Sequence, residues 1–186
     1  FVAEAEAMGL EVKPPDVNAA FAREGIRMLS MKGPLLSMEL YGDPGMRTSK
    51  DLDLMVSPED LSRAGEVLKG LGYELEPHCY GDTPMRRKYY SLLELEKHEV
   101  YHRGEICMEL HWQSDYQMQY TFDAFWERRE ERPFMGRSVA VMGVDDRYPA
   151  LFAHAAEHGF MRLRWLLDLY ELQKKPGFSW ERIMQR

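Results

Sequence analysis

The segment Asp51-Leu52-Asp53-Leu54 limits the folds open to this chain more than any other feature of the sequence. Residues two apart in a β-strand point to the same side, so the two aspartates project together while Leu52 and Leu54 face the core. Two ionised carboxylates side by side repel each other unless a cation lies between them, and such hard oxygen ligands suit Mg²⁺ or Mn²⁺. We therefore expect residues 51–56 to form a strand that carries an exposed, metal-binding aspartate pair.

A third acidic residue, Glu109, lies between apolar residues in the segment Met108-Glu109-Leu110-His111. Polar and apolar residues alternate imperfectly from Leu95 to His102, Arg103-Gly104 supplies a turn, and the chain then returns as a second strand. Glu109 should therefore lie inside a sheet. A polar outward face of that sheet would explain Glu109 without any function.

The remaining segments predict an α+β fold with a mixed β-sheet flanked by helices. Further strands are expected at residues 26–31 and 73–76 and in a hairpin about Gly136, and helices at 16–24, 34–42 and 57–72, after Thr121, and from residue 145 onward. We expect a core of residues 1–144 and a C-terminal helical segment of residues 145–186. The 186 residues are enough for one such domain with a helical annex.

Charge and hydropathy exclude several classes of partner. The formal net charge of -7 leaves no global basic surface for a phosphate backbone, so nucleic acid is not an expected partner. Because the chain has no run of 18 apolar residues and its first residues are acidic, neither a membrane span nor a signal peptide is expected, and we predict a cytoplasmic protein. It opens on Phe1, so we expect it to be a piece of a longer protein.

Three motifs occur here in a fixed order: the MKG turn that ends at Gly33, the block YGDPGMRTSKDLDL that ends at Leu54, and the strand CMELHW of residues 107–112. In this order the chain resembles the uncharacterised bacterial nucleotidyltransferases, within the nucleotidyltransferase superfamily. The tail HAAEHGFMRLRWLLDLYEL, residues 154–172, also looks like the helical C-terminal segment of that family. The resemblance extends over nearly the whole chain and implies a nucleotidyltransferase-like fold.

The resemblance also implies a reaction and a set of site residues. Asp51, Asp53 and Glu109 would hold Mg²⁺ or Mn²⁺, with Glu109 either a metal ligand or the base that deprotonates the acceptor hydroxyl. The Lys32-Gly33 turn would contact the triphosphate. Related branches place a serine after the turn glycine, whereas this chain has Pro34, which lacks a backbone N–H.

Because this chain departs from the family pattern at that serine, two expectations stay open: the triphosphate is bound by Lys32, Arg47 or Lys50, or triphosphate binding has been lost. His111 lies two residues after Glu109 on the same strand face, so it could contact the metal, the nucleotide or the acceptor, and a purely structural role fits equally well. His98 and His102 flank the same hairpin and are further candidates for the site.

Other polar residues have plain structural explanations. His154 and His158 are four residues apart on an expected helix and favour packing beside the site over a zinc pair, because no third ligand follows them at a suitable spacing. Arg162, Arg164 and Asp168 are expected on a solvated helix face with a weak salt bridge. The four tryptophans are interpreted as core residues.

The leading hypothesis is transfer of a nucleoside monophosphate from a nucleoside triphosphate, ATP in the first place, to a small-molecule or protein acceptor. Two alternatives stay open. One is a non-catalytic, antitoxin-like regulatory protein that keeps the fold, which Pro34 favours. The other is a kinase-like phosphoryl transferase that uses the same metal ions.

Overall fold

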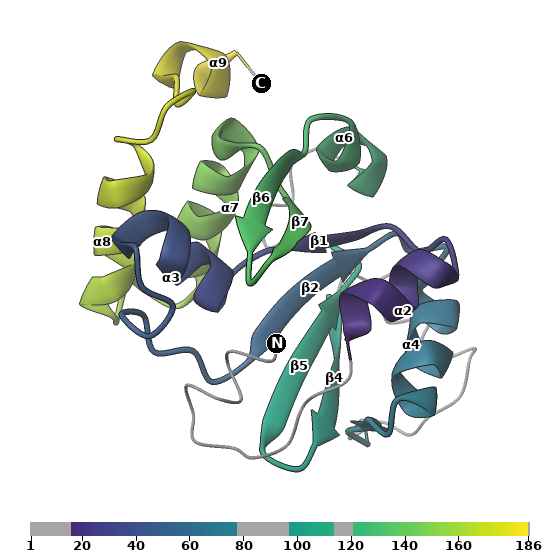
Figure 1. Ribbon diagram of the computed structural model, residues 1–186. Helices are drawn as coiled ribbons and strands as arrows, with labels where there is room; N and C mark the ends of the chain where they lie inside the picture. Colours follow the sequence, from purple (N-terminus) through teal and green to yellow (C-terminus); the bar gives the residue numbers. More distant parts are fainter. Residues whose placement is uncertain (1–15, 78–96, 114–120, 186) are drawn as a thin grey trace. The chain divides into compact units, whose positions relative to one another are not determined.

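The computed structural model describes residues 16–77, 97–113 and 121–185 (Figure 1). The chain divides into two compact units, one drawn from Phe1–Met28 and Lys50–Gln113 and the other from Leu29–Ser49 and Ser114–Arg186. Within the described residues, seven strands pair in both parallel and antiparallel fashion and are accompanied by helices. The predicted α+β class with a mixed sheet is confirmed, while the predicted boundary at residue 144 stays a prediction.

The first unit contains four strands in the spatial order β3-β4-β5-β2. Their bounds are β2 Leu52–Val56, β3 Glu74–Leu75, β4 His98–Arg103 and β5 Ile106–His111. The pair β2–β5 is parallel, whereas β3–β4 and β4–β5 are antiparallel. As the sequence predicted, the strand that carries Glu109 is internal.

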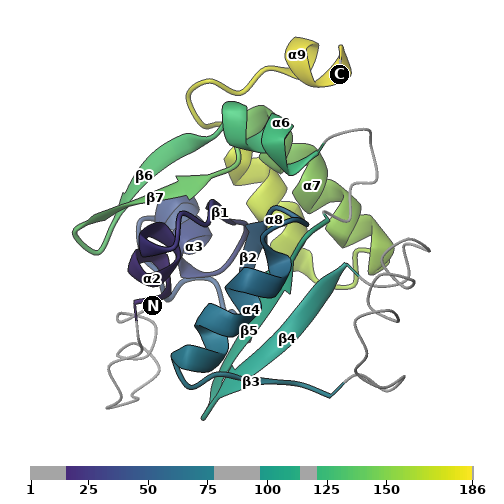
Figure 2. The ribbon, with the colours of Figure 1, turned by 90° about the vertical axis from the view of Figure 1, so that its right-hand side faces the viewer.

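Two helices, α2 (Val17–Arg23) and α4 (Leu61–Gly70), lie against one face of these strands (Figures 1 and 2). Their buried side chains form one core with the apolar face of the sheet, made up of Val17, Phe21, Ile26, Met28, Leu54, Val56, Ala64, Leu68, Tyr73, Tyr101, Met108 and Leu110. Since alternate strand residues point to opposite sides, the helices leave the other face of β2, β4 and β5 to the residues between these apolar positions, among them Asp53, Glu109 and His111. We call this the polar face.

A glycine sets how closely α4 approaches the sheet. A Cβ atom at Gly65 would lie 2.6 Å from the hydroxyl of Tyr101, which is buried and donates a hydrogen bond of 2.7 Å to Glu99 Oε2. Glycine is otherwise unfavourable in a helix interior, so this close contact accounts for its place in α4.

The second unit contains the strand order β1-β7-β6. The strands are β1 (Met28–Ser30, of which the last two residues belong to this unit), β6 (Glu130–Phe134) and β7 (Arg137–Val141), and the helices are α3 (Pro34–Tyr41), α6 (Phe122–Glu127), α7 (Val144–Glu157), α8 (Leu163–Leu172) and α9 (Trp180–Met184). Strands β1 and β7 are parallel, and β6 and β7 form the predicted hairpin. Helices α3, α7 and α8 share a buried cluster formed by Leu36, Leu40, Val144, Leu151, Leu169 and Leu172.

No helix in the described ranges combines the length and the apolar character that crossing a membrane requires.

A buried acid in α3, Glu39, gives this unit a predictable pH dependence. Burial alone would raise the pKa of Glu39, but the guanidinium groups of Arg147 and Arg132 together hold that pKa below its usual value. The folded form therefore binds the proton more weakly than the unfolded chain. The stability from Glu39 is fully present above the unfolded pKa of about 4.5 and is lost as the pH falls through the lower, folded pKa.

When the pH is lowered from neutral to below 4.5, we expect the melting temperature of Glu39→Gln to fall less than that of the unmodified chain. Thermal unfolding followed by circular dichroism at a series of pH values measures this. Glu66→Gln is the matched control, because Glu66 is exposed and its ion pair with Lys69 on α4 contributes little to stability. A Glu39→Gln profile as steep as that of the control would contradict the assignment.

Candidate active site

The predicted carboxylates lie on the polar face of the first unit. Asp51 directly precedes β2, and Asp53 lies within β2 and pairs in register with Glu109 of the parallel strand β5. Register partners on neighbouring strands project to the same side. The predicted strand began at Asp51, whereas β2 begins at Leu52. Asp51 is nevertheless close to this face, because burial and then the negative charge of Asp51 raise the pKa of Cys107, two residues before Glu109. The parallel β2–β5 pairing therefore brings together the three acids that the sequence placed 58 residues apart at their widest.

The expectation that the aspartate pair is exposed is wrong for Asp53, whose side chain is 3% exposed. Asp51 is half-buried, and the Glu109 side chain is 24% exposed. A carboxylate buried this deeply is costly unless it is paired, hydrogen-bonded or bound to a cation. The pattern of alternating residues predicted the face correctly but could not predict how deeply that face is covered.

His111 links two of the acids. Its Nε2 atom lies 3.3 Å from Asp53 Oδ1 and 3.3 Å from Glu109 Oε2, and its side chain is buried. The hydrogen bond from His111, opposed by burial and assisted by His98, lowers the pKa of Glu109, although the charge of Asp53 acts in the opposite direction. Glu109 is therefore a carboxylate anion at neutral pH.

Burial and the negative charge on this face raise the pKa of a neighbouring thiol, that of Cys107. The pKa of the Cys107 thiol is raised to about 11. Burial is the largest cause, and the negative charges of four carboxylates raise this pKa further, those of Asp51, Glu109, Glu76 and Asp53. Cys107 lies on β5 two residues before Glu109 and is a free, half-buried cysteine. Four carboxylates thus act on one point of the sheet, which is the electrostatic setting that a divalent cation relieves.

The residues present fit a divalent metal. Asp53 and Glu109 present oxygen donors in register, and the same histidine nitrogen lies within 3.3 Å of both, so the two carboxylates converge. Asp51 adds a third carboxylate close to this face. Oxygen donors of this kind suit Mg²⁺ or Mn²⁺.

His98 adds a second imidazole to the same face. It lies directly across from His111 in the antiparallel β4–β5 pair, with the ring centroids 4.9 Å apart. One ligand atom each from His98, Glu109 and His111 lies within 4.8 Å of the others. The sequence indicated both His98 and His102 as further candidates for the site, and of the two it is His98 that lies beside His111. The other flanking histidine, His102, instead pairs with Glu76 at 2.7 Å and is exposed.

The Lys32-Gly33 turn belongs to the second unit. Gly33 has φ 83° and ψ -159°, a conformation that is essentially restricted to glycine, and it precedes the first residue of α3, Pro34. The sequence therefore predicted this turn correctly, because Pro34 suits the first helical position and Gly33 suits the turn. Lys32 Nζ lies 3.3 Å from His154 Nδ1 of α7.

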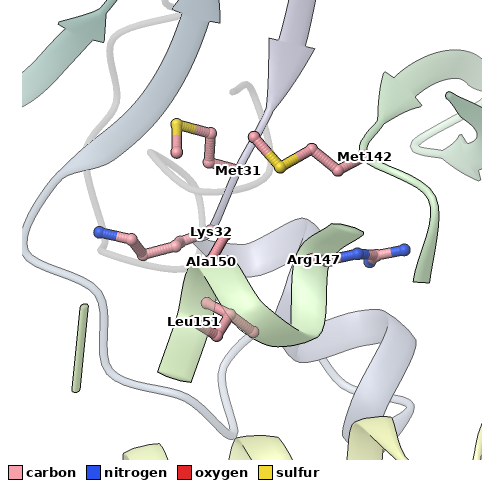
Figure 3. A pocket seen from close by; sticks show the side chains of 6 residues that line it. All are labelled: Met31, Lys32, Met142, Arg147, Ala150 and Leu151. Carbon is pink, nitrogen blue, oxygen red and sulfur yellow. The ribbon is translucent and has the colours of Figure 1, made fainter. Parts of the chain in front are cut away.

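Lys32 also lines a small pocket with Met142, which directly follows β7, and with residues of α7 (Figure 3). The amino group of Lys32 and the guanidinium of Arg147 point in opposite directions there, and the cavity of about 10 Å³ has room for one water at most. This pocket is too small for a nucleotide. His154 and His158 pack against each other and against Trp165, in agreement with their interpretation as packing residues.

Arg47 is held by a buried ion pair. Its Nε atom donates a hydrogen bond of 2.8 Å to Asp168 Oδ2, and the two side chains are 6% and 2% exposed. Tyr41 donates a second hydrogen bond, of 2.7 Å, to Asp168 Oδ1. The interpretation of Asp168 as part of a solvated helix face is therefore wrong. The signal that was missed is a single acid on the apolar side of α8, next to Leu169 and Leu172.

Lys50 is exposed and immediately precedes Asp51 in the first unit. The phosphate-binding roles predicted for Lys32, Arg47 and Lys50 stay predictions. The sequence also contains a basic run, Arg86-Arg87-Lys88, for which a phosphate contact and a solvated loop are alternative interpretations; it lies outside the described residues.

Solved structures with a similar fold include two antibiotic-modifying proteins. The solution structure of the antibiotic-resistance factor ANT(2'')-Ia matches with a TM-score of 0.59 and 14% identity, over 91% of this chain and 84% of that one. The lincosamide antibiotic adenylyltransferase LnuA, with lincomycin bound, matches with a TM-score of 0.55 and 15% identity, over 84% of this chain and 92% of that one. At these identities the likeness establishes the fold.

Sequence similarity identifies the family of this chain as well as its fold. No curated protein matches the chain. The model of a family described as uncharacterised nucleotidyltransferase matches residues 2–186. The matched residues include Gly33, Asp51, Asp53 and Glu109. This chain belongs to that nucleotidyltransferase family.

Proposed function

We propose that this protein transfers a nucleoside monophosphate from ATP to a hydroxyl group of a small molecule, with Mg²⁺ or Mn²⁺ as cofactor. The observation that carries the proposal is the convergence of Asp53 and Glu109, which are register partners within 3.3 Å of the same histidine nitrogen. Family membership adds the reaction class. In the reaction, the acceptor oxygen forms a bond to the α-phosphorus, and pyrophosphate leaves with the electron pair of the broken P–O bond.

Asp51, Asp53 and Glu109 would hold the cations, which when bound neutralise the triphosphate and lower the pKa of the acceptor hydroxyl. The lowered pKa of Glu109 favours a ligand role over that of general base, because an ionised carboxylate of low pKa is a weak proton acceptor. His111 would orient the carboxylates of Asp53 and Glu109 through its Nε2 atom.

The triphosphate would be bound by lysines in preference to Arg47. Arg47 is buried and already engaged by Asp168, so a phosphate contact would have to break an ion pair. Lys50 is exposed next to Asp51. Lys32 precedes Gly33, whose backbone conformation forms the turn into α3. We therefore assign a phosphate contact to Lys50, in the unit that carries the three acids, while the contacts expected of Lys32 and Gly33 in the second unit stay predictions.

A small-molecule acceptor is supported by the proteins of similar fold. LnuA was solved with lincomycin bound, and ANT(2'')-Ia was also solved in complex with adenylyl-2''-tobramycin, at a TM-score of 0.56 to this chain and 14% identity over 91% of this chain and 89% of that one. Hydroxylated compounds such as these two antibiotics are therefore the first acceptors to test.

Labelled ATP tests the reaction class. The chain is incubated with Mg²⁺, an acceptor panel that includes lincomycin and tobramycin, and ATP labelled at the α- or at the γ-phosphate. We expect the α-label on an acceptor and the γ-label in pyrophosphate. Transfer of the γ-label, with ADP as the other product, would instead establish a kinase-like reaction and contradict the proposal.

A further inference from the structure

We propose that His98, Glu109 and His111 form a binding site for a divalent transition-metal ion such as Zn²⁺ or Mn²⁺, and that this site binds such an ion more tightly than it binds Mg²⁺. The inference rests on the proposed function only in taking Glu109 as a metal ligand. It adds two imidazole ligands that a purely carboxylate, Mg²⁺-type site does not contain.

The backbone places these three side chains together. Strands β4 and β5 form an antiparallel pair in which His98 lies opposite His111, and Glu109 is two residues before His111 on the same face. The ligand atoms of the three lie within 4.8 Å of one another. A regular hairpin therefore fixes the cluster, since Gly104, at φ 58°, forms the turn between the strands.

The separation of the donor atoms suits a small cation. His111 Nε2 lies 3.3 Å from Glu109 Oε2. A bound cation would take the place of the Nε2 proton that joins these two groups in the metal-free chain, so His111 would change from a hydrogen-bond donor to a ligand. Neighbouring ligands of a tetrahedral ion with metal–ligand bonds of about 2.0–2.1 Å are themselves about 3.3 Å apart. His98 completes a set of three protein ligands, the number that catalytic zinc sites use while they keep one position open.

The donor chemistry selects the ion. Two imidazole nitrogens with one carboxylate oxygen suit Zn²⁺, Mn²⁺ or Co²⁺, whereas Mg²⁺ prefers oxygen donors and retains its water ligands. His111 is buried, while His98 and Glu109 are half-buried, so the site is reachable from solvent and closed on one side. Asp53 Oδ1, 3.3 Å from His111 Nε2, lies next to this set and connects it to the aspartate pair.

Cobalt binding tests the site directly. Co²⁺ is titrated into the chelator-treated protein, the visible d–d absorption reports binding, and Zn²⁺ and Mg²⁺ are added as competitors. We expect Zn²⁺ to displace Co²⁺ at concentrations at least about a hundredfold below those that Mg²⁺ requires. His98→Gln and His111→Gln are each expected to weaken Co²⁺ binding at least about tenfold to a hundredfold.

His102→Gln is the matched control, because His102 lies on the same strand and face but pairs with the exposed Glu76. It should bind Co²⁺ within about threefold of the unmodified chain. The proposal is overturned if the unmodified chain shows no d–d absorption, or if His98→Gln binds as His102→Gln does. An intense near-ultraviolet thiolate band would equally overturn it, because it would place a cysteine among the ligands.

Two further measurements separate this inference from the proposed function. Asp51→Asn should lose nucleotidyl transfer and keep Co²⁺ binding, whereas an active chain without Co²⁺ binding would contradict this inference alone. Histidine NMR on the unmodified chain needs no variant: Zn²⁺ should shift the ring signals of His98 and His111 and leave those of His102 in place. Equal shifts at all three would contradict the site.

Discussion

Asp53→Asn is expected to lower the rate of pyrophosphate release from ATP at least about a thousandfold, because a metal ligand contributes several kcal/mol to transition-state stabilisation and each 1.36 kcal/mol is tenfold in rate. Asparagine has nearly the same shape, so the change removes the charge without opening a cavity. The assay follows pyrophosphate in the presence of Mg²⁺ and of an acceptor that accepts the α-label.

The same variant should remain folded. Removal of one of two neighbouring negative charges, Asp53 and Glu109, offsets the loss of the contact with His111, so we expect a melting temperature within about 4 °C of the unmodified chain, which corresponds to about 1 kcal/mol for a chain of this size. Asp60→Asn is the control, since Asp60 pairs with Arg63 at the start of α4. Activity of Asp53→Asn close to that of the control would refute the role of Asp53.

Asp168→Ala is expected to destabilise the second unit by about 3–5 kcal/mol, because it leaves the guanidinium of Arg47 buried without its carboxylate and removes the acceptor of the Tyr41 hydroxyl. Urea unfolding followed by circular dichroism measures the change in the free energy of unfolding. Glu171→Ala is a control on the same helix. Its exposed pair with Lys174 is worth less than about 1 kcal/mol.

A double variant that replaces both partners of this ion pair distinguishes a structural role of Arg47 from a nucleotide-binding role. If Arg47 acts only through Asp168, the double variant Arg47→Met/Asp168→Leu should recover much of the lost stability, since apolar residues can replace a buried ion pair. Its affinity for ATP should then match that of the unmodified chain. A loss of ATP affinity in the stable double variant would show that Arg47 contacts the nucleotide.

Local patterns in the sequence predicted the strand-to-helix turn at Gly33, the β4–β5 hairpin and the shared face of Asp51 and Asp53. Each depends on side-chain alternation or on the backbone preferences of glycine and proline, which a few neighbouring residues determine. The turn and the hairpin are confirmed in the described residues, whereas the shared face of Asp51 and Asp53 stays a prediction, because β2 begins only at Leu52.

Partners distant in the sequence were harder to predict. The Arg47–Asp168 pair joins residues 121 positions apart, and its burial follows from tertiary packing that no local pattern contains. The predicted hairpin turn, Arg103-Gly104, would place His98 opposite Glu109. The structure places the turn one residue later, so His98 lies opposite His111 instead. A shift of one residue at a turn thus decides which side chains meet across the strands.

The central claim is that Asp51 and Asp53 hold the metal that binds the nucleotide. Calorimetric titration of a non-hydrolysable ATP analogue, with and without Mg²⁺, into the unmodified chain and into Asp51→Asn/Asp53→Asn tests it most directly. We predict Mg²⁺-dependent binding to the unmodified chain and at least about a hundredfold weaker binding to the double variant, which corresponds to about 2.7 kcal/mol. Equal binding by both proteins, or binding that is indifferent to Mg²⁺, would contradict the assignment.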